Sequence, residues 1–167
     1  SVSGSGRARL AAGKDGNLRA KYFAFREKHK REMARETAER LGVKPAARIA
    51  GWATAGVDPK VMGLGPVPAV RKILKKEKLA IDDFGAVELN EAFAAQVLAC
   101  KKAASSKEFA QQKLGLSEPL GEIEDEKLNV KGGAIALGHP VGATGARIIL
   151  ALLLEMKRQD LHTGLAT

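Results

Sequence analysis

Two short stretches of the chain contain residue types that could do chemistry. The first is Asn90-Glu91-Ala92-Phe93, which follows a short apolar run and precedes a helical pattern. Polar side chains between the carboxyl end of a strand and the start of a helix are well placed to meet a ligand. The alternative is that Asn90 is only the N-cap of that helix and accepts from its free backbone N–H groups. Spacing alone favours the N-cap role.

The second stretch is "GGAIALGHPVGATGARI", residues 132–148, in which His139 lies between Gly138 and Pro140. A histidine there could act as a general base or donate a hydrogen bond to a developing oxyanion. Spacing alone favours a purely structural histidine. The glycines are spaced neither as GxGxxG nor as a Walker loop, so the segment gives little support for phosphate binding.

The remaining candidate groups favour ordinary roles. His29 and His162 lie in polar surroundings and are predicted to be surface residues. Cys100 is the single cysteine and is predicted to be a packing residue inside a helix. The chain has no cluster of Cys and His with metal spacing and no GxSxG nucleophile elbow, so no metal site is predicted.

The elements that must position these residues alternate between helix and strand. The expected helices cover 21–41, 66–76, 90–103 and 144–158, and the expected strands cover 46–56, 86–89, 128–137 and 164–167. Residues 107–125 are charged and are expected to form a surface insertion with a helical start. The 144–158 helix has a wide apolar arc and is expected to be largely buried. This order predicts a layered α/β fold.

Composition limits the class of protein. The chain has 167 residues, no apolar run near the roughly 20 residues of a membrane span, and one cysteine. We therefore expect no membrane partner, no internal disulfide and a reducing, cytoplasmic setting. Residues 1–32 have nine basic and three acidic side chains, and so contribute +6 of the net charge of +9. This segment is left unassigned, and a solvated basic segment is favoured over nucleic-acid binding because no such motif accompanies it.

The pair of motifs NEAF at 90–93 and GGAIALGHPVGATG at 132–145 resembles the thiolase family. The segment 47–74, "ARIAGWATAGVDPKVMGLGPVPAVRKIL", is similar to the part that precedes NEAF in that family. The resemblance covers 33–167 and corresponds to most of the C-terminal domain of a thiolase. It implies a thiolase-like layered α/β fold with two similar halves, of which this chain has one.

The resemblance also implies thioester chemistry on coenzyme A, with the acyl-CoA and CoA as substrates and no further cofactor. His139 matches the histidine that activates a catalytic cysteine and helps to bind an oxyanion. Asn90 matches the asparagine that holds a water in an oxyanion hole. Ala92 and Phe93 match residues that line the acyl pocket, and Gly138 lets the substrate approach His139.

The sequence departs from the family pattern in its cysteines. The nucleophile's region is absent, the chain ends before a Cys-x-Gly stretch, and Cys100 matches neither position. We therefore expect this chain to be a fragment that is inactive alone. Its exposed apolar surface should make it aggregate. We expect the full-length parent protein to form homodimers or homotetramers. The insertion at 107–130 favours a degradative 3-ketoacyl-CoA thiolase. The alternatives are an acetoacetyl-CoA-forming acetyl-CoA acetyltransferase and a catalytically inactive thiolase-like domain with an association role.

Overall fold

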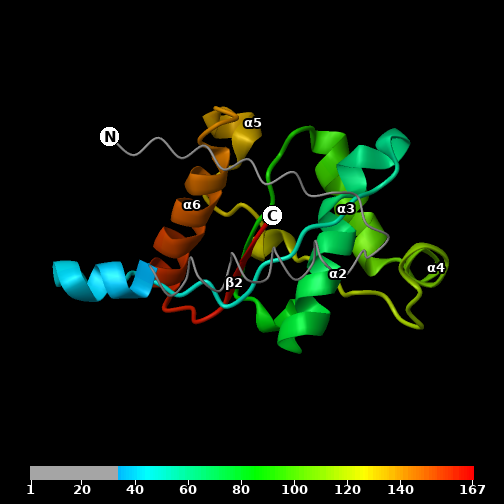
Figure 1. Ribbon diagram of the computed structural model, residues 1–167. Helices are drawn as coiled ribbons and strands as arrows, with labels where there is room; N and C mark the ends of the chain where they lie inside the picture. The colour runs from blue at the N-terminus through cyan, green and yellow to red at the C-terminus, as the bar shows by residue number, and fades with distance from the viewer. Residues whose placement is uncertain (1–33) are drawn as a thin grey trace, which may run out of the picture. The chain divides into compact units, whose positions relative to one another are not determined.

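The computed structural model describes residues 34–167 (Figure 1). The chain divides into two compact units, Ser1–Ala46 and Ala47–Thr167. The predictions for the basic segment 1–32, including His29, lie outside the described residues. Within residues 34–167, no helix is long and apolar enough to cross a membrane.

The described part of the first unit contains a helix over residues 34–41. The helix ends where predicted, because Gly42 takes the left-handed conformation with φ +64°. The backbone N–H of Gly42 donates to Glu39 O at 3.1 Å and that of Val43 to Ala38 O at 3.0 Å, which satisfies carbonyls that the helix leaves free. Arg35 also pairs with Glu39 one turn along the same helix at 2.9 Å.

The second unit is built on a short parallel sheet. Strand β1 (Ala86–Glu88) pairs with strand β2 (Gly164–Ala166), with Val87 opposite Leu165. Both strands lie within the ranges predicted from the sequence. On the other side of β1, Val87 forms a parallel bridge with Leu128. The central position of β1 places its carboxyl end, which leads to Asn90, between two other chain segments.

Helices cover both faces of this sheet. Helix α6 (Thr144–Gln159) packs on one face, and helices α2 (Pro66–Glu77) and α3 (Ala94–Ser105) pack on the other (Figure 1). Val87 and Leu165 point into the layer shared with α2. Because side chains alternate along a strand, Glu88 points to the opposite face, toward α6. The layered α/β fold predicted from the sequence is therefore confirmed.

Short helical segments connect these layers. They are the 3₁₀ helices η1 (Pro59–Leu64), η2 (Ile81–Asp83) and η4 (Asp125–Lys127), the helical turn α4 (Lys107–Phe109), the π-helical turn η3 (Ala110–Leu114) and the one-turn helix α5 (Ala134–Leu137). The helical start expected for the 107–125 insertion is present as α4 and η3. A second cluster of buried side chains, centred on Leu89, Val97 and Cys100, joins the end of β1 to α3.

The strand predicted for residues 46–56 is wrong. In the structure, this segment is extended but does not form a strand. It packs along α2 instead: Lys72 donates to Thr54 O at 2.8 Å, and a Cβ at Gly51 would lie 2.6 Å from the Ile73 side chain. An alternating pattern indicates an extended backbone, but a strand also needs a neighbouring strand with which to pair.

The strand predicted for residues 128–137 is also wrong beyond its first residue. After the Leu128 bridge the chain turns at Asn129, which has φ +47°, and then forms α5. The helix predicted from Asn90 begins four residues later, at Ala94. Apolar runs of this length do not separate strand from helix by periodicity alone.

Helix α6 is less buried than expected. Ile148 and Leu152 pack against the sheet, but Ile149, Leu150 and Leu154 are 43%, 57% and 60% exposed. The wide apolar arc is therefore real, and only one side of it is covered by the described residues. The exposed apolar surface predicted from the sequence is present.

Glu155, near the end of α6, is expected to make the stability of the fold sensitive to acid. Its buried carboxylate accepts from Arg158 and Gln159, which lowers its pKa to about 2 from the usual 4.5. Because the folded-state pKa is the lower one, this contribution to stability is present above about pH 4.5 and is lost as the pH falls toward 2. We expect urea unfolding to show a smaller difference between wild type and Glu155→Gln at pH 3 than at pH 5.5. Glu126→Gln, which changes an exposed carboxylate, serves as control. An equal difference between wild type and Glu155→Gln at both pH values would contradict the lowered pKa of Glu155.

Candidate active site

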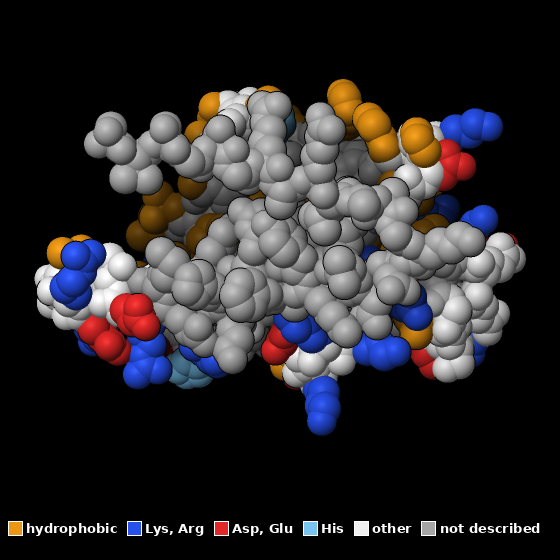
Figure 2. Space-filling model, viewed as in Figure 1, with side chains coloured by type: hydrophobic (Ala, Val, Ile, Leu, Met, Phe, Trp, Pro, Cys, Tyr) orange, Lys and Arg blue, Asp and Glu red, His pale blue; other side chains and the backbone are white. Residues whose placement is uncertain are grey.

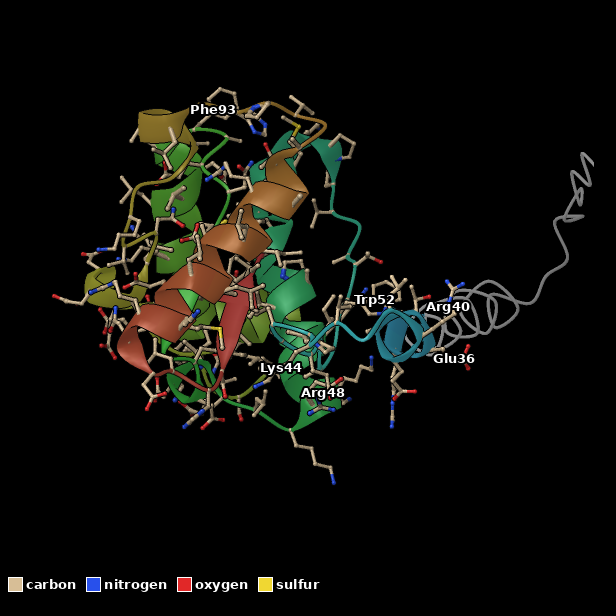
Figure 3. All side chains as sticks on the ribbon, turned by 90° about the vertical axis from the view of Figure 1, so that its left-hand side faces the viewer. Glu36, Arg40, Lys44, Arg48, Trp52 and Phe93 are labelled. Atoms are coloured by element: carbon tan, nitrogen blue, oxygen red, sulfur yellow. The ribbon has the colours of Figure 1, made fainter. Side chains whose placement is uncertain are left out.

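The two motifs meet at one end of the second unit. The carboxyl end of β1 leads into residues 89–93, and the glycine-rich segment leads through α5 to the N-terminus of α6. Figure 3 shows Phe93 beside α5, and Figure 1 shows α5 at the end of α6 where that helix begins. Segments that are about 40 residues apart in the sequence therefore form one surface.

His139 is exposed on this surface and has one clear side-chain partner. Its Nδ1 lies 2.7 Å from Thr144 Oγ1, and the Thr144 hydroxyl donates to Pro140 O at 3.1 Å. With the Thr144 hydroxyl proton assigned to Pro140 O, the Thr144 oxygen accepts from the His139 Nδ1–H. In this assignment Nε2 holds the free lone pair. His139 is therefore arranged to accept a proton, or to donate one after protonation, through Nε2.

Gly138 directs His139 to this surface. It follows α5 with φ +94° and ψ 164°, a combination open essentially only to glycine. Its N–H closes α5 by donating to Ala134 O at 2.9 Å. Any other residue here would force the chain to leave α5 in a different direction and would move His139.

Asn90 is not the N-cap of α3. The cap position belongs to Phe93, which makes no side-chain capping bond. Asn90 instead lies just beyond β1, where its N–H donates to Thr167 O at 2.8 Å. Its Oδ1 is buried and has no hydrogen-bond partner among the described residues. A buried acceptor without a partner is costly, so this atom lacks a hydrogen-bond donor in the arrangement that the described residues make.

Ala92 and Phe93 are both exposed, and Phe93 is 66% exposed. An exposed aromatic ring beside the histidine segment is available to contact an apolar group. Met62 and Ile135, at 72% and 64%, add further exposed apolar area. Hydrophobic side chains also gather along the upper edge of the view in Figure 2.

Sequence reasoning missed Asn129 and Thr144, which help to organise this surface, and noted Glu91 beside Asn90 without assigning its structural role. Asn129 is buried and bridges the end of β1, Glu91 connects the two motifs, and Thr144 orients His139. Glu91 is part of the quoted NEAF motif, but its role depends on partners at positions 129 and 135, which its sequence neighbours do not reveal. The position of Thr144, five residues after His139 at the start of a helix, could have suggested contact.

Glu88 is a further titratable group beneath this surface. Its side chain is 4% exposed, and burial raises its pKa, an effect that the positive charge of Arg147 on α6 partly offsets. The Glu88 Oε2 and the three guanidinium nitrogens of Arg147 have no hydrogen-bond partner among the described residues. These charges lie between sheet and helix and interact across that layer.

Cys100 is a packing residue, as predicted. It is 2% exposed, its Sγ donates to Gly63 O at 3.2 Å, and burial raises the pKa of the thiol. We expect a thiol reagent such as DTNB to label the folded chain at pH 7.5 at least about 100-fold more slowly than the chain in urea, because the protonated, buried thiol is a poor nucleophile. Labelling at the unfolded rate in a chain that remains folded by circular dichroism would contradict this.

The described residues contain no group of three or more His, Cys, Asp or Glu side chains that could hold a metal ion. The chemistry available on this surface is therefore that of His139, Asn90 and the exposed backbone and apolar groups around them. Among the described residues this surface has no thiol, since Cys100 faces the core.

Known proteins resemble this chain in sequence and in fold. Residues 43–167 match the family model described as "Thiolase, C-terminal domain". Over 135 residues, the chain is 48% identical to an acetyl-CoA acetyltransferase of Syntrophomonas wolfei and 53% identical to a 3-ketoacyl-CoA thiolase of Vibrio parahaemolyticus. Each alignment covers 81% of this chain, and 30% and 31% of the respective relatives. The chain thus spans under a third of the length of the relatives that it matches.

A solved structure gives the same result. The crystal structure of the Bacillus anthracis acetyl-CoA acetyltransferase matches with a TM-score of 0.63 and 45% identity. The match covers 78% of this chain and 29% of that one. The residues matched by the family model, 43–167, make up about three quarters of the chain and include both motifs and every residue of the candidate active site. The chain belongs to the thiolase family, through the C-terminal domain of that family.

Proposed function

We propose that this chain supplies the acid–base and oxyanion-binding part of a thiolase active site. The reaction is the CoA-dependent cleavage of a 3-ketoacyl-CoA, or the reverse condensation of two acyl-CoA molecules. The observation that carries the proposal is the orientation of the His139 ring, whose Nδ1 lies 2.7 Å from Thr144 Oγ1 and whose Nε2 is left for a partner at the surface. A base that is oriented in this way can activate a thiol that lies within hydrogen-bonding reach of its Nε2.

In this proposal His139 acts through Nε2. It takes the proton of a cysteine thiol, and the thiolate that results adds to a carbonyl carbon of the substrate. The negative charge then moves to the carbonyl oxygen. The protonated imidazole can return its proton or donate a hydrogen bond to that oxygen, which stabilises the transition state.

Asn90 acts on an oxyanion through a water. Its buried Oδ1, which has no protein partner among the described residues, accepts one hydrogen of the water. The second hydrogen of that water then points to the oxyanion. Gly138 allows the thioester to come close to His139, and Ala92 and Phe93 contact the acyl group through their exposed surface.

The nucleophile of this reaction comes from outside the described residues. Cys100 faces the core, so the reactive cysteine is supplied by another part of the polypeptide or by another chain. The exposed apolar side chains of Phe93 and Ile135, next to the site, support burial of this surface against such a part. We propose that the complete enzyme is a homodimer or homotetramer.

Two substrate classes remain for the activity. The Vibrio relative is named a 3-ketoacyl-CoA thiolase and the Syntrophomonas relative an acetyl-CoA acetyltransferase. We propose the degradative cleavage of 3-ketoacyl-CoA for this chain, because the insertion at 107–130 has the length associated with that branch and the Vibrio relative has the higher identity of the two. Formation of acetoacetyl-CoA is the second candidate, which the Syntrophomonas relative supports.

The test uses the chain and a hybrid enzyme in parallel. In the hybrid, residues 43–167 replace the matching segment of the Vibrio relative, which provides the rest of the polypeptide. Cleavage is followed by loss of 3-ketoacyl-CoA absorbance with acetoacetyl-CoA and with a longer 3-ketoacyl-CoA. We expect the chain alone to be inactive and the hybrid to be active, with a higher kcat/KM on the longer substrate. A folded hybrid without activity on either substrate would contradict the proposal.

A further inference from the structure

The carboxylate of Glu91 joins the two parts of the site. Its Oε1 accepts from Asn129 Nδ2 at 2.8 Å, and its Oε2 accepts from the backbone N–H of Ile135 at 2.9 Å. Both oxygens are therefore used, and each bond reaches a segment about 40 residues away in the sequence. Glu91 is also the immediate neighbour of Asn90.

The Asn129 side of this connection is fixed to the sheet. The Asn129 amide acts like a peptide group next to β1, since its Oδ1 accepts from Leu89 N and its Nδ2 donates to Leu89 O, both at 2.9 Å. The Asn129 N–H donates to Val87 O, also at 2.9 Å. With 9% of its surface exposed, Asn129 is a buried anchor, so its bond to Glu91 ties that carboxylate to the sheet.

The Ile135 side of the connection holds α5. Ile135 is the second residue of this one-turn helix, which ends at Leu137 and continues through Gly138 to His139. A four-residue helix has little stability of its own. Its position therefore depends on tertiary contacts, and the Glu91 bond is one that reaches it from the segment just after β1.

Gly133 leaves the space that the carboxylate fills. A Cβ at Gly133 would lie 2.2 Å from Glu91 Cδ and 2.4 Å from each carboxylate oxygen. The φ of Gly133 is −102°, which other residues adopt without strain. Glycine is thus required at this position by the presence of the Glu91 carboxylate and not by the backbone conformation.

From this geometry we infer that Glu91 is a positioning residue, whose carboxylate holds the His139 segment in register with Asn90. It touches no reacting group, and it acts through α5 and Gly138. The inference rests on the proposed function in so far as His139 and Asn90 are the groups being aligned. The arrangement it predicts for His139 can be measured without any turnover.

The substitution Glu91→Gln tests the inference with almost no change in size. Two donors, Asn129 Nδ2–H and Ile135 N–H, face the side chain, and glutamine offers one acceptor and one NH₂ group. One donor must then face another donor, so one of the two bonds is lost. Glu126→Gln, at an exposed carboxylate outside this connection, is the matched control.

The primary measurement is the ¹⁵N NMR spectrum of the His139 ring in the full 167-residue chain. Wild type and Glu126→Gln should show the resolved Nδ1–H tautomer. Glu91→Gln should move the ¹⁵N chemical shifts of both ring nitrogens toward the averaged values of a free imidazole. The methyl signals of Val70 and Leu74 in the core should stay unchanged. Unchanged His139 ring shifts in a folded Glu91→Gln chain would overturn the inference.

A second measurement covers the case in which the variant does not fold. In the wild-type chain, the scalar coupling across the hydrogen bond between Ile135 ¹⁵N and Glu91 ¹³Cδ should be detectable, and its absence would overturn the inference. In the hybrid enzyme, Glu91→Gln should lower kcat by about 10²-fold, with KM changed by less than about threefold. An inactive wild-type hybrid would count against the proposed function, and the NMR result would still decide the role of Glu91.

Discussion

Replacing His139 by alanine in the hybrid enzyme is expected to lower kcat by about 10³-fold, whereas His162→Ala leaves it unchanged. A positioned general base contributes about 10²–10⁴-fold to the rate, and His139 is the described histidine with an oriented ring. His162 is exposed and lies at the turn before β2. The comparison of two histidine variants separates the loss of a base from the loss of an imidazole anywhere on the chain.

The fold of the His139→Ala variant provides the control for this prediction. Because the His139 side chain is exposed, the variant should keep the circular dichroism spectrum and the thermal midpoint of wild type. Retention of more than a tenth of the wild-type kcat in the variant would contradict the assigned role.

Replacing Leu89 by alanine is expected to cost about 2–5 kcal/mol of unfolding free energy, through lost burial and the cavity that remains. Leu89 is 2% exposed and packs with Val67, Val97 and Cys100 between β1 and α3. It directly precedes Asn90, so this cluster supports one side of the site. The measurement is urea unfolding of the chain, followed by circular dichroism.

Leu98→Ala is the matched control for this prediction. Leu98 is on the same helix as Val97 but is 66% exposed, so its truncation should change the unfolding free energy by less than about 0.5 kcal/mol. A similar loss in the two leucine variants would show that Leu98 is covered in solution. That result would indicate self-association through the exposed face, which sedimentation at two concentrations would detect.

Local sequence determined several features of the structure by itself. Gly42 ends the helix at 34–41, as its position after an apolar-periodic segment predicts. Gly138 takes a conformation that only glycine adopts readily, next to the histidine that the motif identified. The α6 helix, the two strands and the packing role of Cys100 also follow from short-range patterns, because each depends on residues within about one or two helical turns.

Tertiary structure decided what local patterns could not. Residues 47–56 have the alternating pattern of a strand, but they pack against α2 and do not form a strand. Asn90 has an N-cap type and position, and yet the helix begins four residues later, which leaves its Oδ1 free.

The roles of Glu91 and Asn129 likewise come from the tertiary structure. Partners about 40 residues apart carry these interactions, and local preferences say nothing about which distant donor will meet which acceptor. The sequence thus named the chemical groups of the candidate site. The connection of the His139 segment to Asn90 was decided by hydrogen bonds that exist only once the sheet and α5 have come together.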